Sequence, residues 1–193
     1  MSSTQEKVHH AVADWIGDIV ALESHIEEAM DRQLKLESAN PALTAAITRF
    51  HDSVRSSKQR AVAYQEKYGS EAGNPIIKAG SSLLGKAAGM IDMMREDSVS
   101  KALRDDYTAY SLLAISYTML HTTSMSLDDP TTQAFADEGL RTYAALIQDV
   151  SDLMPEAVVQ DLKDNDDLPL PNTDIVERCR EAIQRIWQTT ANA

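Results

Sequence analysis

Apolar side chains recur every three or four residues over unusually long stretches of this chain. The first row comprises Val8, Val12, Trp15, Ile16, Ile19, Ile26, Met30 and Leu34. This spacing places them on one face of a helix, which must be covered by other helices. Comparable rows predict further helices, so that the expected set is 4–37, 41–68, 75–95, 98–127 and 130–154. Long amphipathic helices with short connections indicate an all-α bundle.

Prolines and an acidic segment divide this bundle from the end of the chain. Pro155 is expected to end the fifth helix, because proline lacks the N–H group that a helix interior requires. Residues 163–173 are acidic and contain two prolines, as is typical of a linker. We therefore expect a bundle over 1–162, a linker over 163–173, and an amphipathic helix over 174–190 that packs on the bundle or on a partner.

Composition limits the classes of partner. The formal net charge of −12 argues against binding to nucleic acid and to anionic membrane surfaces, because both would repel the chain. The single cysteine, Cys179, excludes an internal disulfide and fits a reducing compartment. The first residues lack the basic and apolar pattern of a secretory signal. A cytoplasmic protein is the expectation.

Several segments resemble the YciF-like branch of the ferritin-like superfamily. The segments are Ile19-Val20-Ala21-Leu22-Glu23-Ser24-His25-Ile26, Phe50-His51 with Val54, residues 82–91, and residues 114–120. The resemblance implies a ferritin-like four-helix bundle with an extra short helix, to which this chain adds a C-terminal helix. It also implies an oxidative-stress role and a pair of iron ions held by inward carboxylates and histidines.

The resemblance also indicates which positions would carry the metal ligands. The first carboxylate is retained as Glu23, which interrupts the apolar row of its helix and therefore points inward. At the other expected positions the chain has Arg55, Lys58, Tyr110, Leu113 and Tyr143. Lysine and arginine cannot coordinate a metal at neutral pH. The alignment therefore predicts a degenerate site without a metal cofactor.

A polar network is expected to occupy the former metal site. Arg55 or Lys58 would neutralise Glu23, and the hydroxyl groups of Tyr110 and Tyr143 would complete its hydrogen bonds. Without such partners a buried carboxylate would cost several kcal/mol or take up a proton. In the alternative arrangement, the two cations extend outward and Glu23 is solvated at one end of the bundle.

Three functions follow from these positions. The first is a metal-free, non-enzymatic protein that acts by protein–protein interaction or as a stress-associated structural protein, as a homodimer or with another protein. The second is an iron-dependent di-metal oxidoreductase, or a one-metal site at Glu23, Glu27 and His51. The third is a small-anion binder that uses Arg55 and Lys58 with the two tyrosines.

Overall fold

The computed structural model describes residues 3–36, 38–71, 98–164, 168, 170 and 174–191. In this part of the chain all regular structure is helical. The helices are α1 (Ser3–Gln33), α2 (Pro41–Glu71), α4 (Val99–Ser126), α5 (Pro130–Asp164) and α6 (Ile175–Ala191). The expected helix at 75–95 lies outside the described residues. In the described part no helix is long and apolar enough to cross a membrane.

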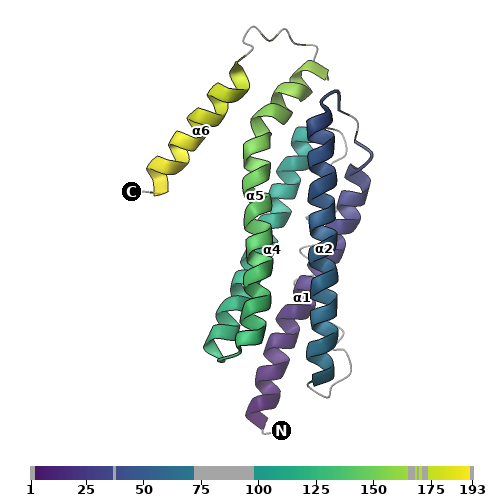
Figure 1. Cartoon of the computed structure of the whole chain (residues 1–193), viewed down its shortest axis with the longest axis vertical. Coiled ribbons are helices and arrows are strands. Elements are labelled where there is room, and N and C mark those ends of the chain that lie inside the picture. Colours follow the sequence, from purple (N-terminus) through teal and green to yellow (C-terminus); the bar gives the residue numbers. More distant parts are fainter. Residues whose placement is uncertain are drawn as a thin grey trace.

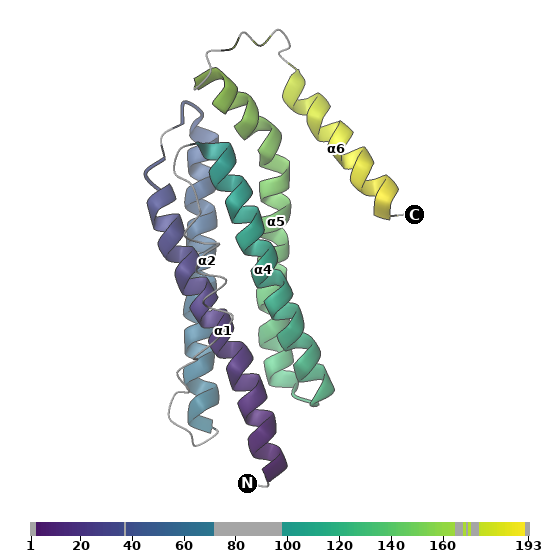
Figure 2. The same cartoon turned by 180° about the vertical axis from the view of Figure 1, so that it is seen from behind.

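Four long helices lie side by side as two hairpins. α1 packs on α2, α4 packs on α5, and the hairpins meet where α1 contacts α4 and α2 contacts α5 (Figure 1). α6 follows as a separate helix that contacts α5 and stands outside the four-helix arrangement (Figure 2). The expectation of an all-α helical bundle is confirmed.

Local sequence accounts for where three helices begin. Pro41 and Pro130 are the first residues of α2 and α5, where proline costs no hydrogen bond. Before them, the Asn40 side chain accepts from the N–H of Ala42, and the Asp129 side chain accepts from the N–H of Thr132. Ser98 caps α4 in the same way. Each cap satisfies an N–H group that has no partner inside its helix.

The core is built from α1, α2, α4 and α5. Its largest fully buried side chains include three tyrosines, Tyr110, Tyr117 and Tyr143, together with Phe50. None of the described residues of α6 belongs to this cluster. Because burial of apolar area is the main stabilising term in folding, the four long helices supply most of the stability of the described structure.

Three helix boundaries differ from the prediction. α2 ends at Glu71 rather than at 68. α5 continues through Pro155 to Asp164, so the expected break at this proline was wrong. The Pro155 side chain is buried, as is Ala157 one half-turn further on, and this packing offsets the lost hydrogen bond. α5 bends towards its C-terminal end (Figure 2), as proline commonly causes. α1 ends at Gln33, and Leu34 is 41% exposed rather than part of the inner face.

Candidate functional site

The Glu23 carboxylate lies in the centre of the four-helix arrangement and is fully buried. Its Oε1 atom accepts three hydrogen bonds from hydroxyl groups on the three other long helices. Ser57 of α2 donates at 2.7 Å, Tyr117 of α4 at 2.9 Å and Tyr143 of α5 at 2.8 Å. Oε2 has no hydrogen-bond partner among the described residues. We name these four residues the Glu23 cluster.

Helical periodicity brings the cluster together. Glu23 replaces an apolar residue in the inner row of α1, so its side chain is carried into the core. Gly139 of α5 leaves room for the Tyr117 ring, because a Cβ atom at this position would lie 2.2 Å from the ring. The rings of Tyr117 and Tyr143 stack with their centroids 5.8 Å apart. The absence of a side chain on α5 thus positions one of the hydroxyl donors.

Burial raises the pKa of the Glu23 carboxyl above its ordinary value, because the core disfavours the charged form. The three hydroxyl donors act in the opposite direction, as does the positive charge of Arg60. Arg60 itself bridges α2 to α5, with its Nε 3.1 Å from Glu138 and an amino group 3.3 Å from the Thr142 hydroxyl. The net result is a carboxyl group that binds a proton more readily than an exposed glutamate.

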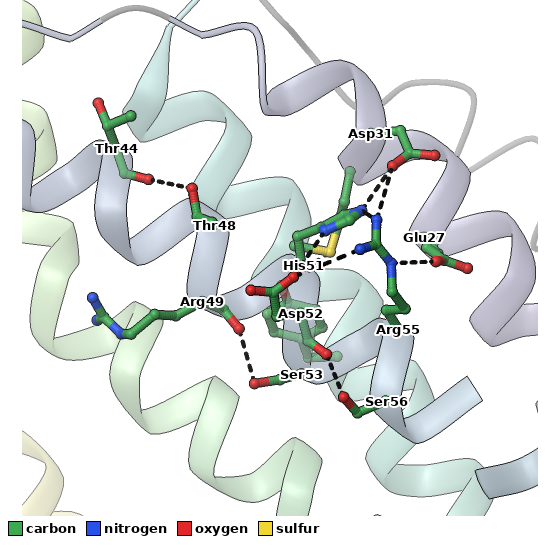
Figure 3. A network of polar contacts seen from close by, with 12 residues as sticks. Glu27, Asp31, Thr44, Thr48, Arg49, His51, Asp52, Ser53, Arg55 and Ser56 are labelled. Atoms are coloured by element: carbon green, nitrogen blue, oxygen red, sulfur yellow. Dashed lines mark hydrogen bonds and ion pairs between the residues drawn. The ribbon is translucent and has the colours of Figure 1, made fainter. Parts of the chain in front are cut away.

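A second polar cluster lies one turn along α1, nearer the surface. The Nε of Arg55 lies 3.2 Å from a carboxylate oxygen of Glu27, and the Lys58 ammonium contacts the other oxygen. The His51 ring is buried and its Nε2 lies 2.7 Å from Asp31, while Asp52 lies close to Nδ1 (Figure 3). The pKa of Glu27 is lowered in spite of partial burial, because the two cations favour its charged form.

A third buried carboxyl group lies between α1 and α4, further along α1. Asp106 of α4 is fully buried and accepts a hydrogen bond of 2.9 Å from the Gln33 side-chain amide. Burial raises the pKa of Asp106 to about 7. Gln33 Oε1 and Asp106 Oδ2 both have no hydrogen-bond partner among the described residues. A proton on Oδ2 would convert one unpaired acceptor into a donor.

The predicted network is only partly present in this geometry. Tyr143 donates to Glu23, as expected. Arg55 and Lys58 do not neutralise Glu23, because both contact Glu27 instead. The Tyr110 hydroxyl donates to the sulfur atom of Met30 at 3.3 Å and not to the carboxylate. The two cations lie on the outer side of α2, since Arg55 is exposed and Lys58 is half-buried.

The same contacts argue against two of the functions expected from the sequence, the small-anion binder and the one-metal site. Arg55 and Lys58 are engaged by Glu27, and Tyr110 by Met30, so the four residues expected to hold a small anion do not surround one cavity. Glu27 is buried, but its oxygens contact the two cations. His51 pairs with Asp31. The structure therefore does not assemble Glu23, Glu27 and His51 around one point.

The donor set of the Glu23 cluster does not fit the pair of iron ions that the resemblance implies. One carboxylate and three hydroxyl groups are present, whereas such a site uses several carboxylates and histidines. Among the described residues, no three histidine, cysteine or acidic side chains are grouped so that they could hold a metal ion. We therefore derive no chemistry through a metal at this position.

Two members of the Glu23 cluster, Ser57 and Tyr117, were missed from the sequence. Tyr117 lies seven residues after Tyr110, so the two tyrosines share a face of α4, and Ser57 lies next to Lys58. The observed donors therefore lie one position from the expected residue on α2 and two turns from the expected residue on α4. Counting polar residues on each inner face would have found both.

The described chain is thus an all-α protein of four long helices with a buried, hydroxyl-bound carboxylate at its centre. It belongs to the family described as "Domain of unknown function (DUF892)", which matches residues 7–163. The crystal structure of a protein from Xanthomonas campestris pv. campestris has a similar fold, with a TM-score of 0.64 and 17% sequence identity over 84% of this chain and 99% of that chain. No curated protein matches the chain.

Proposed function

We propose that this protein is a metal-free, ferritin-like helical bundle of the YciF-like branch, with a degenerate di-metal site. It acts by contact with other proteins, and its first partner is a second copy of the same chain in a homodimer. The observation that carries the proposal is the apolar surface of α6. Ile183, Ile186 and Trp187 are 39%, 65% and 62% exposed, respectively. We name these three residues the α6 patch.

The α6 patch lies on a helix that is held to the bundle at its other end. Arg180 donates to the backbone carbonyl of Asp152 and to the Glu156 carboxylate, both at 3.0 Å. One to two turns later the same side of α6 carries the patch, which those α5 contacts do not cover. Exposed apolar groups that include tryptophan are typical of protein–protein contacts. A partner that covers the patch would remove this apolar area from water.

The Glu23 cluster supports the metal-free part of the proposal. Three hydroxyl donors already converge on one oxygen of the carboxylate, and Arg55 and Lys58 are engaged by Glu27. One carboxylate oxygen is thus held by hydroxyl donors, and the described cluster offers a single carboxylate rather than the several carboxylates and histidines of an iron pair. The stress-associated role rests on the family resemblance alone.

Sedimentation velocity over a range of concentrations tests the homodimer. We expect the full chain to dimerise and the Ile183→Ser/Ile186→Ser/Trp187→Ser variant to bind at least about tenfold more weakly, which corresponds to about 1.4 kcal/mol. Gln184→Ser is the matched control, because Gln184 is exposed on the same helix but outside the patch. Equal dimerisation of the patch variant, or a monomeric wild type, would contradict the homodimer.

Metal analysis tests the absence of a metal separately. Protein purified from iron-supplemented cells is expected to contain no stoichiometric iron or manganese by plasma mass spectrometry, whether it carries Glu23 or Glu23→Ala. Stoichiometric iron in the wild type that is lost in Glu23→Ala would instead support the oxidoreductase alternative. Glu28→Ala is the control, because Glu28 is exposed on the same helix.

A further inference from the structure

Three buried tyrosines lie close together in the core, and two of them donate to Glu23. Tyr110, Tyr117 and Tyr143 are each at most 1% exposed. The Tyr143 ring centroid lies 5.8 Å from that of Tyr117 and 6.1 Å from that of Tyr110. Two of the three phenol groups donate to the same oxygen of Glu23. The core therefore holds oxidisable rings in contact with a potential proton acceptor.

We propose that Tyr117 and Tyr143, together with Glu23, form a redox-active pair that gives up one electron to an external one-electron oxidant. In this step one phenol loses an electron to the oxidant. Its O–H bond breaks, and the proton moves along the existing hydrogen bond to Glu23 Oε1. The products are a neutral tyrosyl radical, a neutral carboxylic acid and the oxidant reduced by one electron. This activity goes beyond the proposed function and needs no metal in the protein.

Charge explains why this site favours the step. An oxidised phenol that keeps its proton is a cation, which a buried core disfavours strongly. Here each phenol oxygen lies 2.8–2.9 Å from the carboxylate oxygen, so the proton moves over a shorter distance than this. The cluster then changes from one buried negative charge to none. Removing the electron thus relieves the desolvation cost that raises the pKa of Glu23.

Aromatic rings connect the pair to the edge of the bundle. The Tyr117 ring lies 5.8 Å from Phe135, which stacks on Tyr64 at 4.1 Å, and Tyr64 lies 6.1 Å from Tyr68. Tyr64 and Tyr68 are only partly buried, so an oxidant at the surface can approach this end of the series. An electron from the core needs to cross only short distances between rings.

Burial also predicts persistence of the radical. A tyrosyl radical at Tyr117 or Tyr143 would lie behind four helices, where it cannot meet a second radical or a dissolved reductant directly. A radical on a partly exposed tyrosine lacks this protection. Lifetime therefore distinguishes a redox-active core pair from incidental oxidation of the surface.

The proposal is tested on the full chain by flash photolysis with ruthenium tris-bipyridine and a sacrificial cobalt(III) electron acceptor. The samples are then frozen and measured by electron paramagnetic resonance. In mildly alkaline buffer we expect a long-lived neutral tyrosyl radical. The Tyr117→Phe/Tyr143→Phe variant should lose this signal, and Glu23→Gln should lose most of it because the proton acceptor is gone. Tyr107→Phe is the matched control, because Tyr107 is a partly buried tyrosine of α4 outside the Glu23 cluster and should leave the signal unchanged.

Single Phe variants keep the test valid if the double variant or Glu23→Gln fails to fold by circular dichroism. Tyr117→Phe and Tyr143→Phe each leave one phenol on Glu23 and should each change the hyperfine pattern of the signal. An absent radical, a radical that decays equally fast in all variants, a hyperfine pattern that neither single Phe variant changes, or a long-lived signal that survives loss of both tyrosines or of Glu23 would overturn the proposal.

Discussion

Among the described residues, three acidic side chains of the bundle are buried, and each is compensated by different partners. Glu23 receives three hydroxyl donors, Glu27 two cations, and Asp106 one amide. The inward direction of Glu23 could be predicted, because it interrupts an apolar row. Of its partners only Tyr143 was predicted. Arg55 and Lys58 were assigned to Glu23 wrongly, because they also reach Glu27 one turn along α1, and the choice between the two carboxylates depends on side-chain positions in space.

Asp106 gives a prediction about pH. Its folded-state pKa of about 7 lies above the ordinary value of 3.8, so the folded chain binds this proton more tightly than the unfolded chain. The stabilising contribution is therefore fully present below the unfolded value and is lost as the pH rises through about 7. This difference between the folded and unfolded pKa values of Asp106 corresponds to about 4 kcal/mol of folding free energy.

The Asp106→Asn variant removes this titration and can still bond to Gln33. We expect its free energy of unfolding in urea to exceed that of the wild type above neutral pH, by at most about 4 kcal/mol. The difference should shrink as the pH falls towards the ordinary pKa of aspartate. Asp149→Asn, at an exposed position, is the control. A difference between Asp106→Asn and wild type that does not change with pH would contradict the raised pKa.

At the scale of the helices, the periodic pattern predicted most of the described elements. Proline at the start of α2 and α5 marked their first residues correctly, whereas Pro155 inside α5 did not mark an end. Local propensity set the starts of α2 and α5, because an N–H group in the first turn has no partner inside the helix and proline loses nothing by lacking it. Tertiary burial kept α5 continuous at Pro155, because this residue is buried.

The contact between α4 and α5 gives a second prediction. In Gly139→Ala the added Cβ atom would collide with the Tyr117 ring, whose nearest atoms lie 2.2–2.5 Å away. The ring must move and weaken its bond to Glu23. We expect the free energy of unfolding to fall by about 2 kcal/mol, although alanine is intrinsically the better helix former. Chemical denaturation measures the change.

A matched substitution on the same helix controls for helix propensity. Gln148→Ala, at an exposed position of α5, is expected to change stability by at most about 0.5 kcal/mol. If Gly139→Ala were as stable as Gln148→Ala, the close approach of Tyr117 to the α5 backbone would be wrong.

At the scale of the whole molecule, the core and the C-terminal helix are distinct. The described core cluster lies in the four long helices, while α6 is held to α5 by Arg180 and leaves the α6 patch exposed. From the sequence, α6 was expected to pack on the bundle or on a partner. Amphipathicity shows that a helix has an apolar face but does not show which surface covers it.

Truncation tests this division. A chain that ends at Asp164 keeps the described core, so we expect cooperative thermal unfolding with a midpoint close to that of the full chain, followed by circular dichroism. A chain that ends at Leu153 also removes buried Pro155 and Ala157 and should unfold at a clearly lower temperature. An unfolded product from the first truncation would show that α6 is part of the folding unit.

The sequence by itself determined that the chain is helical, where most described helices begin, and that Glu23 faces inward, because these properties follow from periodicity along one chain. Only the tertiary structure decided that Ser57 and Tyr117 join Tyr143 on Glu23, that Arg55 and Lys58 bind Glu27, and that Asp106 is buried. Partners on different helices depend on rotation and axial offset between the helices. Those quantities are set by the packing of the whole core, including the space left by Gly139.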